Sequence, residues 1–139
     1  MEEKRESKFY LSKHKYLEMY HYSAQYYDYA ARLASLDRDD VKARGARVLK
    51  SSKTRPISDS VAELAIERAT VASKMELIED CVKEAIFGKM EYYIYIFRCV
   101  TEELTYEKLE EEMGLSKDID KNTFGYYRMR YYWLLAKER

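Results

Sequence analysis

Apolar residues recur at three- and four-residue intervals along most of the chain, a spacing typical of amphipathic helices. From about residue 8 to residue 36 no glycine or proline interrupts this pattern, so it predicts one long helix. A second long helix is predicted to begin at Ser60, because Ser60 and Glu63 have the spacing of a capping box. From residue 61 to residue 85 its apolar positions, with Arg68 as the one charged exception, follow the spacing of a coiled-coil seam. This helix packs either on the first helix or on its own copy in another chain.

The segment between these two helices, residues 37–57, breaks the apolar pattern with Gly45 and Pro56. It carries seven Lys or Arg against three acids. Three interpretations fit this composition: a basic linker, a short helix over residues 41–49, or an arm in residues 42–55 that contacts phosphates and becomes ordered on nucleic acid.

The stretch after Gly88, residues 90–100, is apolar nearly all round. Its aromatic and β-branched residues are compatible with a strand. Nothing else in the chain pairs with a lone strand, however, so a helix is predicted here.

Two shorter helical patterns follow. In the first, Leu109 and Met113 share an apolar stripe, Thr105 is a suitable N-cap, and Gly114 suits the left-handed conformation after the last turn. The second has an apolar stripe made of Phe124, Tyr127, Tyr131, Leu134 and Leu135. A short helix, a glycine turn and a second helix with a basic outer face predict a helix-turn-helix, whose second helix enters a DNA major groove.

Together these patterns predict an all-α fold. Four glycines and one proline leave little material for the turns of a β fold. Two long N-terminal helices, arranged as a hairpin or a coiled coil, precede a three-helix module that contains the helix-turn-helix. The expected domains are residues 1–59 (long helix and basic linker), 60–87 (long amphipathic helix) and 88–139 (DNA-binding module).

Charge is unevenly distributed, although the formal net charge is zero. Residues 121–139 hold five Lys or Arg against one acid, whereas residues 101–112 hold six acids against one Lys. A local basic field favours docking on phosphates even when the chain has no net excess of cations. The 15 tyrosines form two groups, at residues 10–29 and 92–132. Packing and oligomerisation explain most of them, and stacking on nucleobases is the alternative for the rest.

Motifs that carry catalysis are missing. The chain has no Gly-rich phosphate loop and no HExxH, CxxC or GxSxG motif, so we expect no enzyme activity, cofactor or metal. His14 and His21 are about 10 Å apart along one helix, too far to ligate one ion together. The acids at 107 and 110–112 are expected to form a solvated face rather than a Mg²⁺ site. Two cysteines, without a signal peptide or an apolar run of about 18 residues, predict a reduced, cytoplasmic setting and no membrane insertion.

Six residues near the C-terminus are the candidate DNA-binding residues: Lys121, Asn122, Thr123, Tyr126, Arg128 and Arg130. The first three lie at the helix end that approaches base edges, and asparagine pairs bidentately with adenine. Asn122 is alternatively no more than the helix N-cap, a role that also suits Asp120. Tyr126 is expected over the groove. The two arginines suit phosphates, which fix the register but read no sequence.

A family resemblance rests on part of the same region: Ser116, Thr123-Phe124, Arg128, Tyr131-Tyr132 and Leu135 resemble the end of region 4 of bacterial sigma factors. In layout the chain is similar to the phage-encoded ArpU/RinA group of late-gene transcription regulators, which place a sigma-region-4-like module after two long helices. Residues 57–86 resemble that group's S-D-x-V-x-E-L helix and the charged run after it. The chain departs from the pattern in a longer turn at 117–121 and in Gly125 and Tyr126.

The resemblance implies a sequence-specific transcription regulator of phage or mobile-element origin. Such a protein binds double-stranded DNA, and we expect a homodimer formed through the long helices, with RNA polymerase as a further candidate partner. The alternative is a helical phage assembly or packaging adaptor, such as a small terminase-like or scaffold protein, in which the Tyr-rich helices build a ring or bundle.

Overall fold

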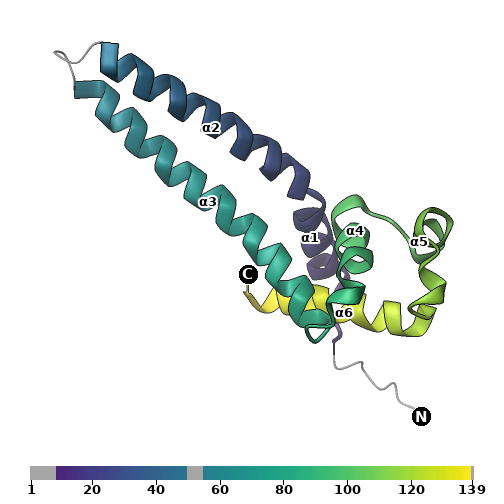
Figure 1. Cartoon of the computed structure of the whole chain (residues 1–139). Coiled ribbons are helices and arrows are strands. Elements are labelled where there is room, and N and C mark those ends of the chain that lie inside the picture. Colours follow the sequence, from purple (N-terminus) through teal and green to yellow (C-terminus); the bar gives the residue numbers. More distant parts are fainter. Residues whose placement is uncertain (1–8, 50–54, 139) are drawn as a thin grey trace. The chain divides into compact units, whose positions relative to one another are not determined.

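The chain folds into helices joined by short connections (Figure 1). The computed structural model describes the backbone of residues 9–49 and 55–138 and the side chains of residues 9–39 and 61–138. All regular secondary structure in these ranges is helical, which confirms the predicted all-α class. The α-helices are α1 (Lys13–Ala24), α2 (Tyr26–Leu49), α3 (Arg55–Ala85), α4 (Tyr93–Glu102), α5 (Tyr106–Met113) and α6 (Lys121–Glu138). Two single 3₁₀ turns, η1 (Met90–Tyr92) and η2 (Leu115–Lys117), precede α4 and follow α5.

The described residues divide into two compact units. Unit 1 contains the chain up to Tyr26 and again from Leu77 onward, and unit 2 contains Tyr27–Glu76. Among the helices the structure describes, none combines the length and the hydropathy that crossing a lipid bilayer requires.

The prediction of one unbroken helix over residues 8–36 is wrong, because the chain has two helices there with a break at Gln25. The first of them begins only at Lys13, where the Ser12 hydroxyl accepts a hydrogen bond from the Lys15 amide at 3.2 Å. Close to the break, the buried Ser23 hydroxyl donates to the Met19 carbonyl at 2.9 Å. A serine that bonds back to the preceding turn bends a helix, and this contact gives no apolar signal in the sequence.

The expected break over residues 37–57 is also placed differently. Of the three interpretations, the helical one describes residues 41–49, because α2 continues through Gly45 to Leu49. Residues 50–54 and the side chains of 42–55 lie outside the described residues. Helix α3 begins at Arg55, so Ser60 lies inside the helix and is not its N-cap as predicted. Pro56 is compatible with this earlier start, because first-turn amides have no partner within the helix.

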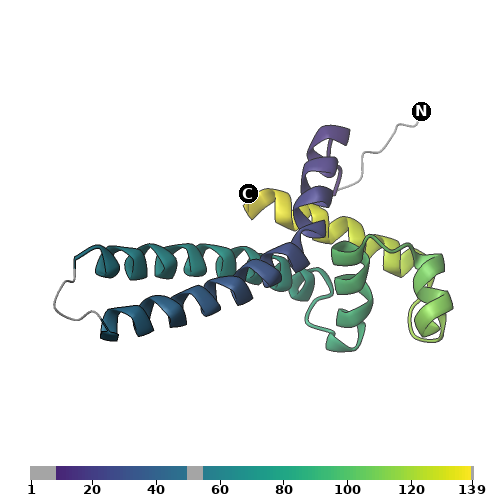
Figure 2. The same cartoon turned by 90° about the horizontal axis from the view of Figure 1, so that it is seen from above.

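Unit 2 contains α2 from Tyr27 onward and α3 up to Glu76, which lie side by side in opposite directions (Figures 1 and 2). Its buried hydrophobic side chains among those described are Leu36 and Val71. An ion pair of 2.6 Å joins Asp37 to Arg68, the one charge in the apolar run of α3. The charged exception in the predicted seam is therefore explained by a partner on the neighbouring helix.

Unit 1 is built around α1, α4 and α6, which pack against one another. Its core also includes buried residues from the C-terminal part of α3, such as Ile78 and Val82. At its centre the hydroxyl of Tyr131, fully buried, lies 2.6 Å from the Ser23 hydroxyl. Since Ser23 donates to Met19, Tyr131 donates to Ser23, and a polar bond links α1 to α6 inside an apolar core.

Helix α3 ends where Phe87 and Gly88 adopt left-handed conformations, with φ of 57° and 75°. The helix then predicted over residues 90–100 is present as η1 followed by α4. The break after Gly88 and the helical choice for this apolar stretch are both confirmed.

Candidate functional site

The connection between α5 and α6 follows local signals in the sequence. The Thr105 hydroxyl caps α5 by accepting from the Lys108 amide at 3.1 Å, as predicted. Gly114 ends the helix in the left-handed conformation with φ of 64°, which a residue without a Cβ adopts without strain. Leu115 and Ile119 then enter the core, with exposures of 0% and 4%. The connection between α5 and α6 is thus held in place by two buried apolar residues.

Two tyrosine hydroxyls from neighbouring helices hold this turn. Tyr95 of α4 donates to the Asp118 carboxylate at 2.5 Å. Tyr106 of α5 donates to the Ile119 carbonyl at 3.0 Å. The carboxylate of Asp118 also raises the pKa of Tyr95, so the phenol stays protonated and keeps donating. These bonds fix the position from which α6 starts.

Asp120 is the N-cap of α6. Its carboxylate accepts from the amides of Asn122 and Thr123 at 3.1 and 3.3 Å, and from the Thr123 hydroxyl at 2.6 Å. These hydrogen bonds, first of all that from the Thr123 hydroxyl, lower the pKa of Asp120. Of the two N-cap candidates, Asp120 has this role, and the Asn122 side chain is left exposed to solvent.

Lys121, the first residue of α6, pairs with Glu107 of α5 across 2.6 Å. The side chains are 69% and 67% exposed, so water screens this pair. The contact lowers the pKa of Glu107 and raises that of Lys121. The first cation of the helix is therefore available at the surface but has an acidic neighbour.

The exposed face of α6 is aromatic and apolar rather than basic. Asn122, Tyr126 and Met129 lie at successive helical turns, with Tyr126 43% and Met129 41% exposed. The ring of Phe9 packs edge-on against Tyr126 at 5.4 Å between centroids. The outer surface that the sequence predicted to be cationic thus offers an amide, a phenol and a thioether.

Arg128 and Arg130 are half-buried and bonded to the protein, in contrast to the outward-facing cations expected. The Arg128 guanidinium donates to the Tyr16 hydroxyl of α1 at 3.2 Å. The Arg130 guanidinium donates to the Glu84 carbonyl at 3.3 and 3.4 Å and lies 4.1 Å above the Phe87 ring. Because the arginines alternate with apolar residues, the sequence pattern alone does not determine the direction of their side chains. Tertiary contacts determine it. Arg130 contacts the Glu84 carbonyl at the C-terminal end of α3, where a cation is favoured.

The opposite, apolar side of α6 is confirmed. All five residues of the predicted stripe are buried: Phe124, Tyr127, Tyr131, Leu134 and Leu135. Burial also raises the pKa of Tyr131 far above its ordinary value. The helix is therefore held firmly along most of its length, and only its first turn and one stripe face solvent.

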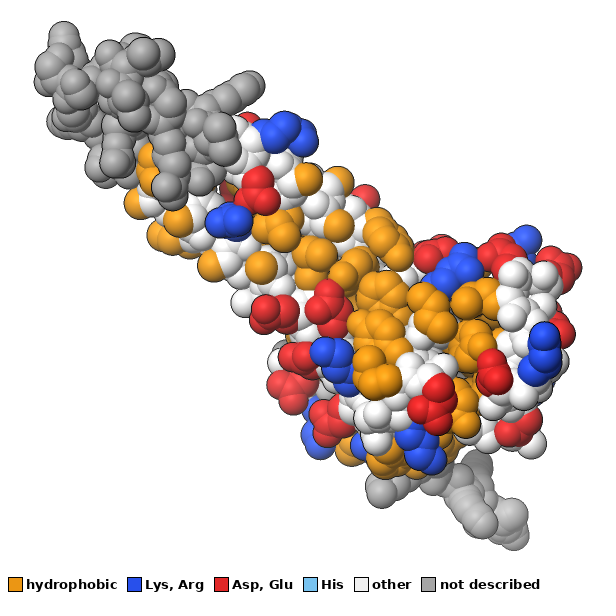
Figure 3. Space-filling model, in the orientation of Figure 1, with side chains coloured by type: hydrophobic (Ala, Val, Ile, Leu, Met, Phe, Trp, Pro, Cys, Tyr) orange, Lys and Arg blue, Asp and Glu red, His pale blue; other side chains and the backbone are white. Residues whose placement is uncertain are grey.

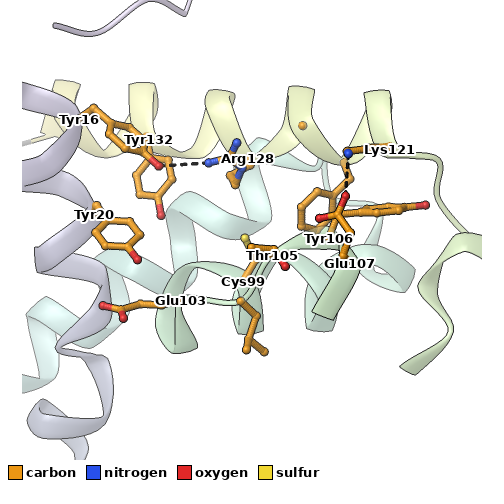
Figure 4. Close-up of a pocket in the computed structure, with 13 residues that line it drawn as sticks. Tyr16, Tyr20, Cys99, Glu103, Thr105, Tyr106, Glu107, Lys121, Arg128 and Tyr132 are labelled. Atoms are coloured by element: carbon orange, nitrogen blue, oxygen red, sulfur yellow. Dashed lines mark hydrogen bonds and ion pairs between the residues drawn. The ribbon is translucent and has the colours of Figure 1, made fainter. Parts of the chain in front are cut away.

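A cavity of about 400 Å³ opens beside this first turn (Figure 4). We call it the α1–α6 cavity. Its walls include Tyr16 and Tyr20 of α1, Glu103 after α4, and Gly125, Arg128 and Tyr132 of α6. Figure 4 shows Arg128 directed toward Tyr16, with Glu103 on the α4 side of the cavity. The cavity thus brings together aromatic rings, one guanidinium and one carboxylate.

The thiol of Cys99 lines this cavity but is only 4% exposed. Burial raises its pKa to about 12, although the nearby Arg128 acts in the opposite direction. A thiol with so high a pKa is a poor nucleophile at neutral pH.

The α1–α6 cavity is not predicted by the sequence pattern. Tyr16 and Tyr20 have the spacing of an apolar helix face, and the same spacing serves a core and a cavity wall alike. The available signal was Gly125, a glycine inside a predicted helix, which is unfavourable unless a reason exists.

Comparisons with known proteins found no matching family model, no similar curated protein and no similar solved structure.

Proposed function

We propose that the protein is a sequence-specific DNA-binding transcription regulator in which α5 and α6 form a helix-turn-helix. The observation that carries this proposal is the exposed first turn of α6. Lys121 and Asn122 face solvent there, whereas Phe124 and Tyr127 are buried. A helix that is held by its buried side and presents its N-terminal end is suited to a major groove. The resemblance to sigma region 4 and to the ArpU/RinA group supports a phage or mobile-element origin.

Base reading is assigned to the solvent-facing stripe. Asn122 is free of the capping role, so its amide is available for a bidentate bond to adenine. Tyr126 follows one turn later and suits contact with a thymine methyl group. Thr123 contributes less, because its hydroxyl is bonded to Asp120.

Phosphate contacts are assigned to Lys121, Arg128 and Arg130. Lys121 exchanges an exposed ion pair for a phosphate at small cost. The two arginines must first leave Tyr16 and Glu84. About three contacts per copy correspond to a slope of about −3 in log affinity against log salt, a modest dependence for a DNA-binding protein.

The test is binding of the full chain to duplex DNA from its own genomic neighbourhood, measured by fluorescence anisotropy between 50 and 200 mM salt. Asn122→Ala is expected to reduce the preference for the specific site over random DNA by about tenfold, since a bidentate base contact contributes about 1–3 kcal/mol of discrimination. Lys121→Ala is expected to weaken binding to both duplexes alike. Lys89→Ala, an exposed cation outside the proposed DNA-binding and dimerisation helices, is the matched control.

Absence of salt-sensitive binding at low ionic strength would overturn the proposal. Equal effects of Asn122→Ala on specific and random DNA would remove Asn122 from base reading while leaving the helix-turn-helix in place.

Dimerisation is proposed through α2 and α3. In unit 2, Ile66 is 67% and Tyr27 48% exposed, which leaves apolar surface that a second copy would cover. The acidic residues Glu110 and Glu111 on the exposed side of α5 are the proposed contact for a basic surface of RNA polymerase.

A second candidate function is a helical assembly or packaging adaptor. Figure 3 shows hydrophobic side chains gathered over α4, where Ile94 is 44% exposed, and Phe87 and Met90 are each 53% exposed. Exposed apolar surface of this kind is typical of interfaces between subunits. Light scattering separates the two functions, because a large closed oligomer favours the adaptor and a dimer favours the regulator.

A further inference from the structure

The α1–α6 cavity has the dimensions of a small-molecule site. Its volume of about 400 Å³ falls within the range of ligand pockets, about 300–1,000 Å³. Its apolar walls are preformed, because Tyr16 stacks on Tyr20 at 6.0 Å and meets Tyr132 edge-on at 5.0 Å. Phe124, which is 3% exposed, supplies a further ring. A flat apolar group would therefore find aromatic partners without rearrangement.

Arg128 gives the cavity its charge. A guanidinium has five N–H donors, and in the described part of the chain Arg128 uses one hydrogen bond, to Tyr16. The side chain is nevertheless half-buried and lines the cavity. Unused donors on a partly desolvated cation favour an anionic acceptor, and the planar guanidinium matches carboxylate and phosphate groups.

Gly125 supports a ligand site independently of Arg128. It lies inside α6, where glycine is less stable than alanine, and its φ is not positive. A Cβ added to Gly125 would meet nothing within 4 Å. Neither backbone conformation nor packing within the described chain therefore requires glycine. The position lines the α1–α6 cavity, and an absent side chain there keeps space open for a molecule that is not part of the protein.

The acids at the cavity restrict what enters. Glu103 and Glu107 both line it, and Lys121 already pairs with Glu107. The lining therefore carries two carboxylates and two cations, and a cavity without net charge suits a ligand with a single negative group. The burial of Tyr20 and the Glu103 carboxylate also raise the pKa of Tyr20, which keeps that wall neutral.

We propose that the α1–α6 cavity binds a small organic anion, a carboxylate or phosphate group joined to a flat apolar ring. The anionic group accepts hydrogen bonds from Arg128, and the ring lies among Tyr16, Tyr132 and Phe124 above Gly125. This site is distinct from the proposed base-reading stripe of α6 and does not depend on DNA binding, although it shares Arg128 with the proposed phosphate contacts.

The test uses phenyl phosphate and benzoate as probes, with benzyl alcohol as the uncharged control and inorganic phosphate as the ringless control. Binding to the full chain is measured by isothermal titration and by the shift in Tm. We expect at least one of the two ring anions to bind at least tenfold more tightly than either control.

Two substitutions locate the site. Arg128→Gln is expected to weaken binding of the ring anion at least tenfold, and Gly125→Leu, which fills the cavity, is expected to abolish it. Arg32→Gln and Thr70→Leu, both on exposed positions of unit 2, are the matched controls and should leave binding unchanged. Circular dichroism establishes that each variant is folded.

Gly125→Ala provides a readout that packing alone does not give. It is expected to raise the Tm of the free protein by about 2–6 °C, because alanine favours the helix. At the same time it should reduce probe affinity several-fold. The proposal would be overturned if neither ring anion binds the wild type better than the two control compounds do. It would also be overturned if a ring anion binds Gly125→Leu as tightly as it binds the wild type. A third outcome would also overturn the proposal: the wild type binds no probe, and Gly125→Leu loses duplex binding. That result would place Gly125 in the DNA interface.

Discussion

Units 1 and 2 consist of equally regular helices but are stabilised in different ways. In unit 2 the described hydrophobic side chains that are buried are Leu36 and Val71, and exposed ion pairs connect α2 to α3. In unit 1, by contrast, three helices enclose an interior that holds whole aromatic rings, among them Tyr131 and Tyr132. Two helices share a single contact surface, whereas three or more create an interior. Packing therefore dominates the stability of unit 1 much more than that of unit 2.

The largest effect is expected from the centre of unit 1. Tyr131→Ala should lower the free energy of unfolding by about 3–5 kcal/mol, as for other large buried aromatic residues. Urea denaturation measures this loss. Tyr131→Phe keeps the ring and removes only the bond to Ser23, so its cost should be about 1 kcal/mol. Similar costs for both variants would mean that the polar bond, and not the packing, stabilises the core.

A smaller loss is expected from the buried leucine of unit 2. Leu36→Ala should cost about 2–3 kcal/mol, the lower part of the range for leucine, because a two-helix contact collapses more easily around a cavity. The control is Glu63→Gln, at an exposed position of α3, which should change stability by less than about 0.5 kcal/mol. A cost for Leu36→Ala equal to that of Tyr131→Ala would contradict the contrast between the units.

The cap of α6 should give a pH-dependent effect. The folded-state pKa of Asp120 is lowered, so its contribution is complete above the ordinary aspartate value of about 4 and is lost as the pH falls through the lowered pKa. Asp120→Ala should lower the Tm at pH 7 by about 2–6 °C. The difference between the variant and the wild type should shrink as the pH falls from the ordinary aspartate value through the lowered pKa. A difference that persists in acid would exclude the carboxylate as its cause.

The smallest effect is expected from the ion pairs of unit 2. Arg68 and Asp37 have side chains 53% and 50% exposed, so their interaction should contribute less than about 1 kcal/mol. A double-mutant cycle with Arg68→Gln and Asp37→Asn measures it, and 0.5 M salt should reduce it further. An interaction of several kcal/mol would show that unit 2 relies on charge more than on its two buried residues.

The sequence predicted those parts of the fold that depend on neighbouring residues. Thr105 and Gly114 bound α5 as expected, because a cap and a left-handed glycine act within one turn. The buried stripe of α6 was also predicted, since five apolar residues on one side of a helix determine which side is buried.

The features of the fold and the site that were not predicted depend on contacts between residues distant in sequence. The break at Gln25 lies beside Ser23, whose bond to Tyr131 spans 108 positions. The inward turn of Arg128 depends on Tyr16, 112 positions away, and the α1–α6 cavity forms only when these helices meet. Periodicity identifies which side of a helix is apolar but not which partner a long polar side chain reaches.

The bond between Ser23 and Tyr131 also has a consequence for biosynthesis. Helix α1 leaves the ribosome long before α6 is translated, so its apolar side remains without its partner while more than a hundred further residues are added. Contacts between residues so far apart slow folding, and they leave hydrophobic surface exposed in aggregation-prone folding intermediates. We therefore expect nascent chains arrested before Tyr131 to associate with a holdase chaperone, and release to follow once the last helix has emerged from the exit tunnel.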